Sequence, residues 1–210
     1  MKSITISLTS LATCILVSCD NPADTSNKAE TSAPKTISTD GAEGEKWVFT
    51  EDSTITFEGS KVTGSHTGGF KKISGAFYID QSTLASSGHI ITIDMSSVYS
   101  DNDKLTTKLK SSDFFEVDTY PTSTFLATEL KEAEVSIDGS THTLTGNFSL
   151  HGVEKSIQIP VVVAQESELI TINADFFINR FDFNIKYPGK TDDLIRKEVV
   201  IKFNLKAKKG

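Results

Sequence analysis

Apolar and polar residues alternate with a period of two along most of the chain after position 46. A period of two puts successive side chains on opposite faces, so each such run predicts a β-strand with one apolar face. The clearest case is 143–163, where two alternating runs are separated by the short loop His151–Glu154. Because Gly152 can take a positive φ, the sequence predicts a hairpin here. A hairpin needs further strands to share its apolar face.

Other parts of the chain supply those strands. Further period-two runs lie at 47–57, 61–66, 73–79, 91–95, 123–128, 133–137, 170–178 and 199–205. One helix is expected at 104–110, because Leu105 and Leu109 lie four residues apart and the Asp and Asn residues before them can cap its start. Strands and helices do not alternate, which argues against a parallel α/β sheet. The pattern predicts an all-β fold of about eight strands, an antiparallel barrel or a sandwich, with one short helix.

The N-terminus has the pattern of a targeting segment. Lys2 is followed by a mostly apolar run from Ile4 to Val17, which suits a signal peptide and is too short to span a bilayer. The run ends in Leu-Val-Ser-Cys19, which resembles the lipobox of bacterial lipoproteins, where the cysteine is acylated and becomes the first mature residue. An ordinary secretory signal that contains a cysteine is the alternative. Lipidation at Cys19 would anchor the protein in a membrane, since several acyl chains overcome the weak binding of one.

Residues 20–45 are polar or small, and Ile37 is their only large apolar residue. Such a segment buries too little surface to offset its ordering entropy, so a flexible tether is expected. The predicted organisation is a lipoprotein signal peptide at 1–19, a tether at 20–45 and a β-barrel domain at 46–210. The protein is then expected in the bacterial cell envelope, lipid-anchored on the periplasmic side or at the cell surface.

Composition argues against several classes of function. The formal net charge is -7 and the chain has no basic cluster, which argues against a nucleic-acid partner. The only cysteines, Cys14 and Cys19, precede the domain, so neither an internal disulfide nor a thiolate site is expected there. The histidines are scattered, and neither a nucleophile elbow nor a phosphate loop is present. We therefore expect a protein without an enzymatic activity, a cofactor or a metal site.

Several phrases of the chain together resemble the YceI-like family. They are Trp47 with Ser53–Phe57, Gly64–Phe70, Lys110–Phe115 with Tyr120-Pro121 and Thr124-Phe125, Gly146–Val153, Phe177–Phe183 and Val199–Phe203. The resemblance covers about 46–206. It implies an extended, lipocalin-like antiparallel barrel that is periplasmic in many members and holds a long polyisoprenoid chain in some. Two positions depart from the family pattern: Asn184 stands where glycine is usual, and Lys108 stands where histidine is common.

A barrel of eight strands is wide enough either to be filled by side chains or to hold one slender ligand. Because pockets are mostly apolar, the ligand would be a long hydrocarbon such as a polyisoprenoid or the tail of an isoprenoid quinone. The residues expected to point inward are Phe49, Phe57, Phe77, Ile93, Phe148, Ile159, Phe176 and Phe203. For each of them, ordinary core packing is the alternative to ligand contact.

The mouth of the barrel has its own candidates. Phe114 and Phe115 follow the predicted helix and can cap the opening, or one can plug the barrel while the other covers the helix. Arg180 and Asp182 lie two apart and can anchor a ligand headgroup, or they can form a structural ion pair or fix a loop. His66 can line the opening, or it is a solvent-facing loop histidine.

The function expected from these features is carriage or sequestration of an isoprenoid-type lipid by a membrane-tethered protein. The alternatives are a filled barrel that serves as an interaction or stress-response module, and an enzyme acting on a lipid, for which the sequence offers no nucleophile and base. The oligomeric state stays open, a homodimer included.

Overall fold

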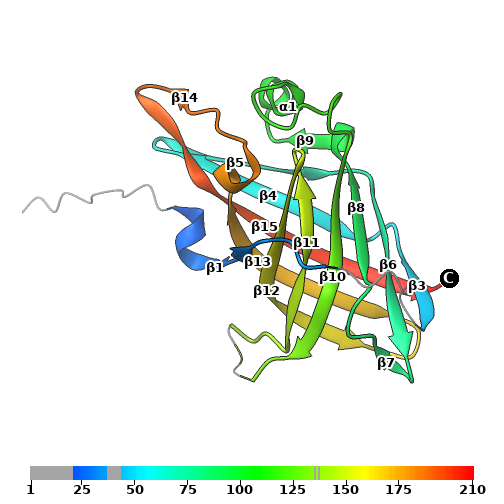
Figure 1. Ribbon diagram of the computed structural model, residues 1–210. Helices are drawn as coiled ribbons and strands as arrows, with labels where there is room; N and C mark the ends of the chain where they lie inside the picture. Colours follow the sequence, from blue (N-terminus) through cyan, green and yellow to red (C-terminus); the bar gives the residue numbers. More distant parts are fainter. Residues whose placement is uncertain (1–20, 37–43, 135, 137) are drawn as a thin grey trace, which may run out of the picture.

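The computed structural model describes residues 21–36, 44–134, 136 and 138–210. Its centre is a closed antiparallel barrel of eight strands (Figure 1). In order around the wall the strands are β3 (Glu45–Phe49), β6 (Ile73–Asp80), β8 (Ile90–Asp94), β10 (Thr122–Glu132), β11 (His142–Leu150), β12 (Val153–Gln165), β13 (Ile170–Asn179) and β15 (Asp193–Lys209). The barrel closes because β15 pairs with both β13 and β3. The all-β class predicted from the alternating pattern is confirmed, and of the barrel and the sandwich that the pattern left open, the structure has the barrel that the resemblance implies.

On one side, the sheet extends beyond the closed barrel. Strand β15 pairs with β3 at its C-terminal end and with β4 along most of its remaining length, and β5 and β9 continue the sheet from there. The remaining elements are β4 (Thr54–Lys61), β5 (Gly64–Phe70), β9 (Val98–Ser100), β1 (Asn27–Lys28), β2 (Glu30–Ser32), β7 (Thr83–Leu84), β14 (Gly189–Lys190), α1 (Asp103–Lys110) and the 3-10 helices η1 (Pro22–Thr25), η2 (Met95–Ser97) and η3 (Arg180–Phe183). The extended barrel thus has the helix α1 over one end (Figure 1).

The hairpin predicted at 143–163 is confirmed as β11 and β12. Its turn is the pair His151 and Gly152, with φ of 51° and 72°. Two consecutive positive φ values suit the right-handed twist of the paired strands. The pairing is continuous from Leu150 opposite Val153 to His142 opposite Val161.

The predicted helix is also confirmed. Asn102 caps α1, because its side-chain oxygen accepts hydrogen bonds from the backbone N–H groups of Lys104 and Leu105. Leu109 is buried and Leu105 packs against the core, so the apolar stripe of the helix faces the barrel. Asn184 adopts the left-handed conformation with φ of 59°, as a position usually held by glycine requires.

Three local predictions differ from the structure. The strand predicted at 61–66 is wrong, because β4 ends at Lys61, the chain turns at 62–63 and β5 begins at Gly64. Strand β10 runs from Thr122 to Glu132 without a break, beyond the short strand predicted at 123–128. The strand predicted at 133–137 does not form at the described residues 133, 134 and 136. The alternation there is a poor guide, because the chain turns at Asp138-Gly139, both with positive φ.

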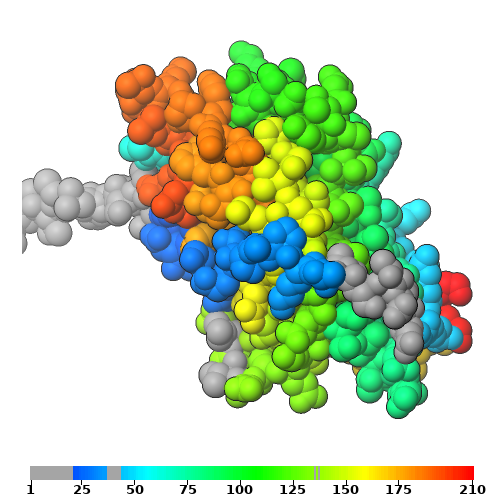
Figure 2. Space-filling model, in the orientation of Figure 1, coloured from blue at the N-terminus to red at the C-terminus, as the bar shows by residue number. Residues whose placement is uncertain are grey.

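The flexible tether predicted for 20–45 is wrong for the described residues 21–36. This segment lies along the outside of the barrel (Figure 2), where β1 pairs with β13 in parallel and β2 pairs with β12 antiparallel. Asn147 also bonds both the N–H and the carbonyl of Lys35. Composition indicates how much apolar surface a segment can bury by itself. A segment that pairs with a sheet edge is held by backbone hydrogen bonds instead, which do not depend on apolar side chains. We call Asn27–Ser32 the strap.

Side chains fill the half of the barrel around β3 and β6. The rings of Phe49 and Phe77 lie 4.9 Å apart, and Phe77 also contacts the imidazole of His89 at 5.7 Å between centroids. His89 is only 2% exposed. Its Nδ1 accepts from the Tyr78 N–H at 3.2 Å, and its Nε2–H donates to the Ala85 carbonyl at 2.8 Å. These two bonds require the neutral imidazole.

We expect acid to destabilise the protein through His89. Burial lowers the pKa of His89 to about 4, so the unfolded chain, with a His pKa near 6.5, takes up the proton first. Stability is therefore present above about pH 6.5 and is lost between pH 6.5 and 4, by about 3 kcal/mol in all. Urea unfolding of the protein and of His89→Gln at several pH values measures this loss. His142→Asn is the surface control, and an unchanged pH slope in His89→Gln would contradict the assignment.

Candidate ligand-binding site

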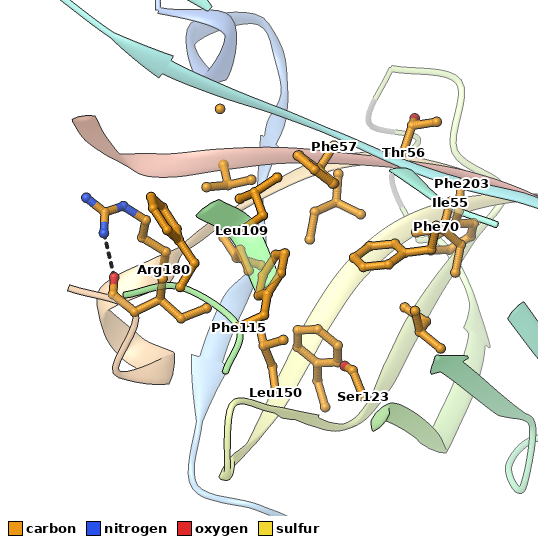
Figure 3. A pocket seen from close by; sticks show the side chains of 18 of the residues that line it. Ile55, Thr56, Phe57, Phe70, Leu109, Phe115, Ser123, Leu150, Arg180 and Phe203 are labelled. Carbon is orange, nitrogen blue, oxygen red and sulfur yellow. Dashed lines mark hydrogen bonds between the residues drawn. The ribbon is translucent and has the colours of Figure 1, made fainter. Parts of the chain in front are cut away.

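The half of the barrel beneath α1 contains a cavity of about 320 Å³ that is partly open to solvent (Figure 3). Strands β4, β5, β8, β10, β11, β12, β13 and β15 contribute aliphatic and aromatic side chains to its wall, and α1 adds Leu105 and Leu109. Its polar and charged lining residues are Thr56, Ser60, Lys61, His66, Ser123 and Arg180. The cavity is therefore an almost wholly apolar volume that the protein's own side chains leave unfilled.

The structure places most of the inward set at this cavity. The members that line it are Phe57, Ile93, Phe148, Ile159, Phe176 and Phe203. Phe49 and Phe77 do not line it, because they pack against each other in the filled half of the barrel. Their ligand contact is not supported, while contact of the other residues with a ligand stays a prediction.

Other lining residues were missed by the sequence interpretation. Leu144, Ile157, Ile178 and Ile201 share a strand and a parity with residues that were chosen, so the alternation itself could have found them. Leu105 and Leu109 could be found only by knowing that the helix covers the barrel. The predicted set favours large aromatic residues, whereas the cavity wall also contains many aliphatic side chains.

Aromatic rings lie over the α1 end of the cavity. Phe115 stands 6.5 Å from Phe57 and 6.1 Å from Phe70, centroid to centroid, so the three rings form a cluster. Phe114 is buried against Tyr187 at 5.4 Å. Both predicted capping residues thus line the cavity, Phe115 within the cluster and Phe114 against the loop that precedes β14.

Lys108 holds that loop from the other side. Its ammonium lies 4.5 Å from the centre of the Tyr187 ring and pairs with Asp113. The Asp113 carboxylate raises the pKa of Lys108, which keeps the cation charged. The lysine that departs from the family pattern therefore joins α1 to the loop before β14 through a cation–π contact.

Arg180 is a structural residue rather than a free anchor. It is 3% exposed, and its guanidinium donates to the carbonyls of Ile185, Ile195 and Arg196 at 2.6, 3.1 and 3.0 Å. Burial lowers its pKa, yet arginine remains ionised in proteins. Figure 3 shows the guanidinium directed away from the aromatic cluster. The loop-fixation alternative thus describes Arg180.

Asp182 does not act with Arg180. It accepts a hydrogen bond from Asn179 at 3.4 Å, and it does not line the cavity. The structure therefore does not bring Arg180 and Asp182 together as a polar pair. Side chains two residues apart share a side only in an extended strand, whereas here they lie in the 3-10 helix η3.

His66 lies at the rim and is partly exposed. Its Nδ1 is 2.9 Å from a carboxylate oxygen of Asp101, and the Thr67 N–H on the other oxygen holds the pKa of Asp101 below its ordinary value. Lys61 pairs with Asp193 and lowers the pKa of that carboxyl. Together with Arg180, every charged side chain in the lining has a partner within the protein. Among the described residues, the lumen therefore offers no unpaired charge to a ligand.

Two further features concern only the described residues. In that part of the chain, no three His, Cys, Asp or Glu residues come together in a way that could hold a metal ion. No helix found there is long and apolar enough to cross a bilayer. Cys19 and the predicted signal peptide lie outside the described residues.

Comparison with known proteins agrees with this geometry. A family model described as the YceI-like domain matches residues 47–207. A UPF0312 protein of Pseudomonas putida is 27% identical over 140 residues, which cover 64% of this chain and 71% of that protein. Protein YceI of Shigella flexneri is 29% identical over 125 residues, covering 57% and 63%.

Solved structures share the fold. The crystal structure of BcnA from Burkholderia cenocepacia has a TM-score of 0.64 at 27% identity, and the match covers 74% of this chain and 96% of that one. A polyisoprenoid binding domain from Saccharophagus degradans has a TM-score of 0.63 at 19% identity, covering 80% and 100%. At that identity the second match shows the fold alone.

Proposed function

The chain belongs to the YceI-like family, and on that premise we propose that it is an envelope lipoprotein that carries or sequesters a long apolar lipid inside its barrel. The observation that carries the proposal is the cavity of about 320 Å³ with its apolar wall. The ligand class is a polyisoprenoid or the tail of an isoprenoid quinone. The protein binds this ligand without performing chemistry on it.

Packing energetics support a bound hydrocarbon. Protein interiors are normally close-packed, and volume left without atoms forgoes dispersion contacts. An apolar chain in the lumen would recover these contacts and would lose its own apolar surface to water, at about 25 cal/mol per Å². A wall of aliphatic and aromatic residues from eight strands therefore favours a long, flexible and uncharged ligand.

The charge distribution supports the same ligand class. Lys61, His66 and Arg180 already interact with groups of the protein, so a charged headgroup inside the lumen would lack a counterpart. The solved polyisoprenoid binding domain has this fold, which is consistent with the proposal. The lipobox-like sequence at Cys19 supports the membrane anchor and the place in the envelope.

The test uses the full chain expressed in a bacterium with its own signal sequence. We expect organic extraction of the protein purified from membranes, followed by mass spectrometry, to release an isoprenoid lipid in near-equal molar amount. The N-terminal peptide should carry acyl chains on Cys19. The Cys19→Ser variant should no longer be found in the membrane fraction, but it should still contain the bound lipid. Repeated extraction without lipid above the level of an unrelated barrel protein would refute the carrier function, and an unacylated Cys19 would refute the anchor.

A further inference from the structure

The barrel wall is interrupted between β12 and β13. These strands pair directly only where 162–165 lie opposite 170–173. By contrast, β11 pairs with β12 along the whole of 142–150, and β13 pairs with β15 along the whole of 170–179. The wall is therefore continuous on both sides of the interruption, which is a local feature of this one seam.

The strap occupies the interruption. Asn27 lies opposite Phe176 of β13, and Thr31 lies opposite Ile157 of β12. Between them, the backbone N–H of Ala29 donates to the Phe177 carbonyl at 2.9 Å. The strap thus crosses from one edge of the seam to the other and satisfies backbone groups on both.

The strap is held weakly compared with the strands beside it. It pairs with two residues of β13 and three of β12. Lys28, Glu30 and Ser32 are exposed, and Ala29 is its one buried side chain. Segments with few buried apolar contacts and exposed backbone bonds open at a small fraction of the global unfolding free energy. Fewer backbone hydrogen bonds therefore hold the strap than hold the strands on either side of it.

The cavity lies directly behind this seam. Ile157 and Ile159 of β12 and Phe176 and Ile178 of β13 line the lumen, and they are the residues that flank the interruption. The α1 end is the other possible route. The cluster of Phe57, Phe70 and Phe115 narrows that end, where Lys61 and His66 line a rim that is partly open to solvent, and packed side chains fill the opposite half.

We infer that the seam between β12 and β13 is the port through which an apolar ligand enters and leaves the lumen, and that the strap is its movable cover. The inference rests on the proposed function. Cys19 stands two residues before Asn21, the first described residue, so the cover is the part of the barrel nearest in sequence to the proposed anchor. Its position suits transfer of a hydrocarbon between membrane and lumen.

The test clamps the strap with a disulfide. Glu30 and Gln158 are exposed partners in register, and the Cα separation of such partners falls within the range that a disulfide spans. The variant carries Glu30→Cys and Gln158→Cys in the full chain with Cys14→Ser and Cys19→Ser, so that only the new thiols are present. The control clamp, Lys131→Cys with Thr143→Cys, joins β10 to β11 in an uninterrupted part of the wall.

The probe is geranylgeraniol with a dansyl group, followed by stopped-flow fluorescence. We expect oxidation of the strap clamp to slow both association and dissociation, each by roughly tenfold or more, because a gate changes rates and not end states. The dissociation constant should stay unchanged, dithiothreitol should restore the rates, and the control clamp should have no effect. Unchanged rates in the oxidised strap clamp, or equal slowing in the control clamp, would overturn the port.

A second pair of variants tests the port without a disulfide. Ala29→Glu buries a charge under the strap and should displace it, so both rates should rise. Ala33→Glu adds the same charge at an exposed position beyond the strap and should leave them unchanged. Equal rates in the two variants would contradict the port. If the probe binds neither the unmodified protein nor any variant, the proposed function fails, and the port fails with it.

Discussion

Arg180→Ala is expected to lower the free energy of unfolding by about 3–5 kcal/mol. The guanidinium is buried and donates to three backbone carbonyls, those of Ile185, Ile195 and Arg196. Its removal leaves these acceptors without donors in a place that water reaches poorly, and each such loss costs about 1–3 kcal/mol. The loop after η3 would also lose its attachment to β15. Urea unfolding followed by circular dichroism measures the change.

Two companion variants sharpen this test. Lys197→Ala, at an exposed position of β15, should change the free energy of unfolding by no more than about 0.5 kcal/mol. Arg180→Lys should recover only part of the loss, because an ammonium group cannot reproduce the planar fork of a guanidinium. A loss below about 1 kcal/mol in Arg180→Ala would sink the structural role and return Arg180 to consideration as a headgroup anchor.

Ile201→Trp is expected to weaken binding of the dansyl geranylgeraniol probe by about a hundredfold, equivalent to about 2.7 kcal/mol. Ile201 lies opposite Phe57 in the wall and lines the cavity. An indole there would occupy volume that the ligand needs. Fluorescence titration at equilibrium measures the affinity.

The matched control places the same bulk outside the barrel. Val162 lies on the outer face of β12 and is 38% exposed. Val162→Trp should leave the affinity unchanged. Because the cavity accepts the added atoms, Ile201→Trp should cost less stability than the roughly 1–3 kcal/mol typical of overpacking a filled core. Undiminished binding in Ile201→Trp would show that the probe sits elsewhere.

Local pattern was enough to predict the strands, the central hairpin and the helix, whereas the choice of a barrel over a sandwich came from the resemblance. Alternation along 143–163 and the glycine at position 152 specify a hairpin through the geometry of neighbouring residues, and the structure has that hairpin. The helix at α1 follows from two leucines and an Asn cap in the same way. These features depend on residues close in sequence, so the sequence carries them directly.

Features that depend on distant partners could not be predicted. The acceptors of Arg180 in β15 lie 15 and 16 residues away, and no spacing rule reveals them. The strap is held by backbone bonds to strands more than a hundred residues along the chain, so its polar composition was misleading. Whether the barrel is filled or hollow depends on the summed volumes of facing side chains. Phe49 and Phe148 look alike in sequence, but only Phe148 lines the cavity.

The packed rings of Phe49 and Phe77 limit the length of the ligand that fits inside the barrel. They lie in the filled half of the barrel, which bounds the cavity on that side, so the lumen has a fixed depth. A prenyl chain longer than the lumen must leave its surplus outside. Each added isoprene unit then strengthens binding only until the chain fills the lumen. The affinity should therefore rise with chain length among short chains and stay constant among long ones.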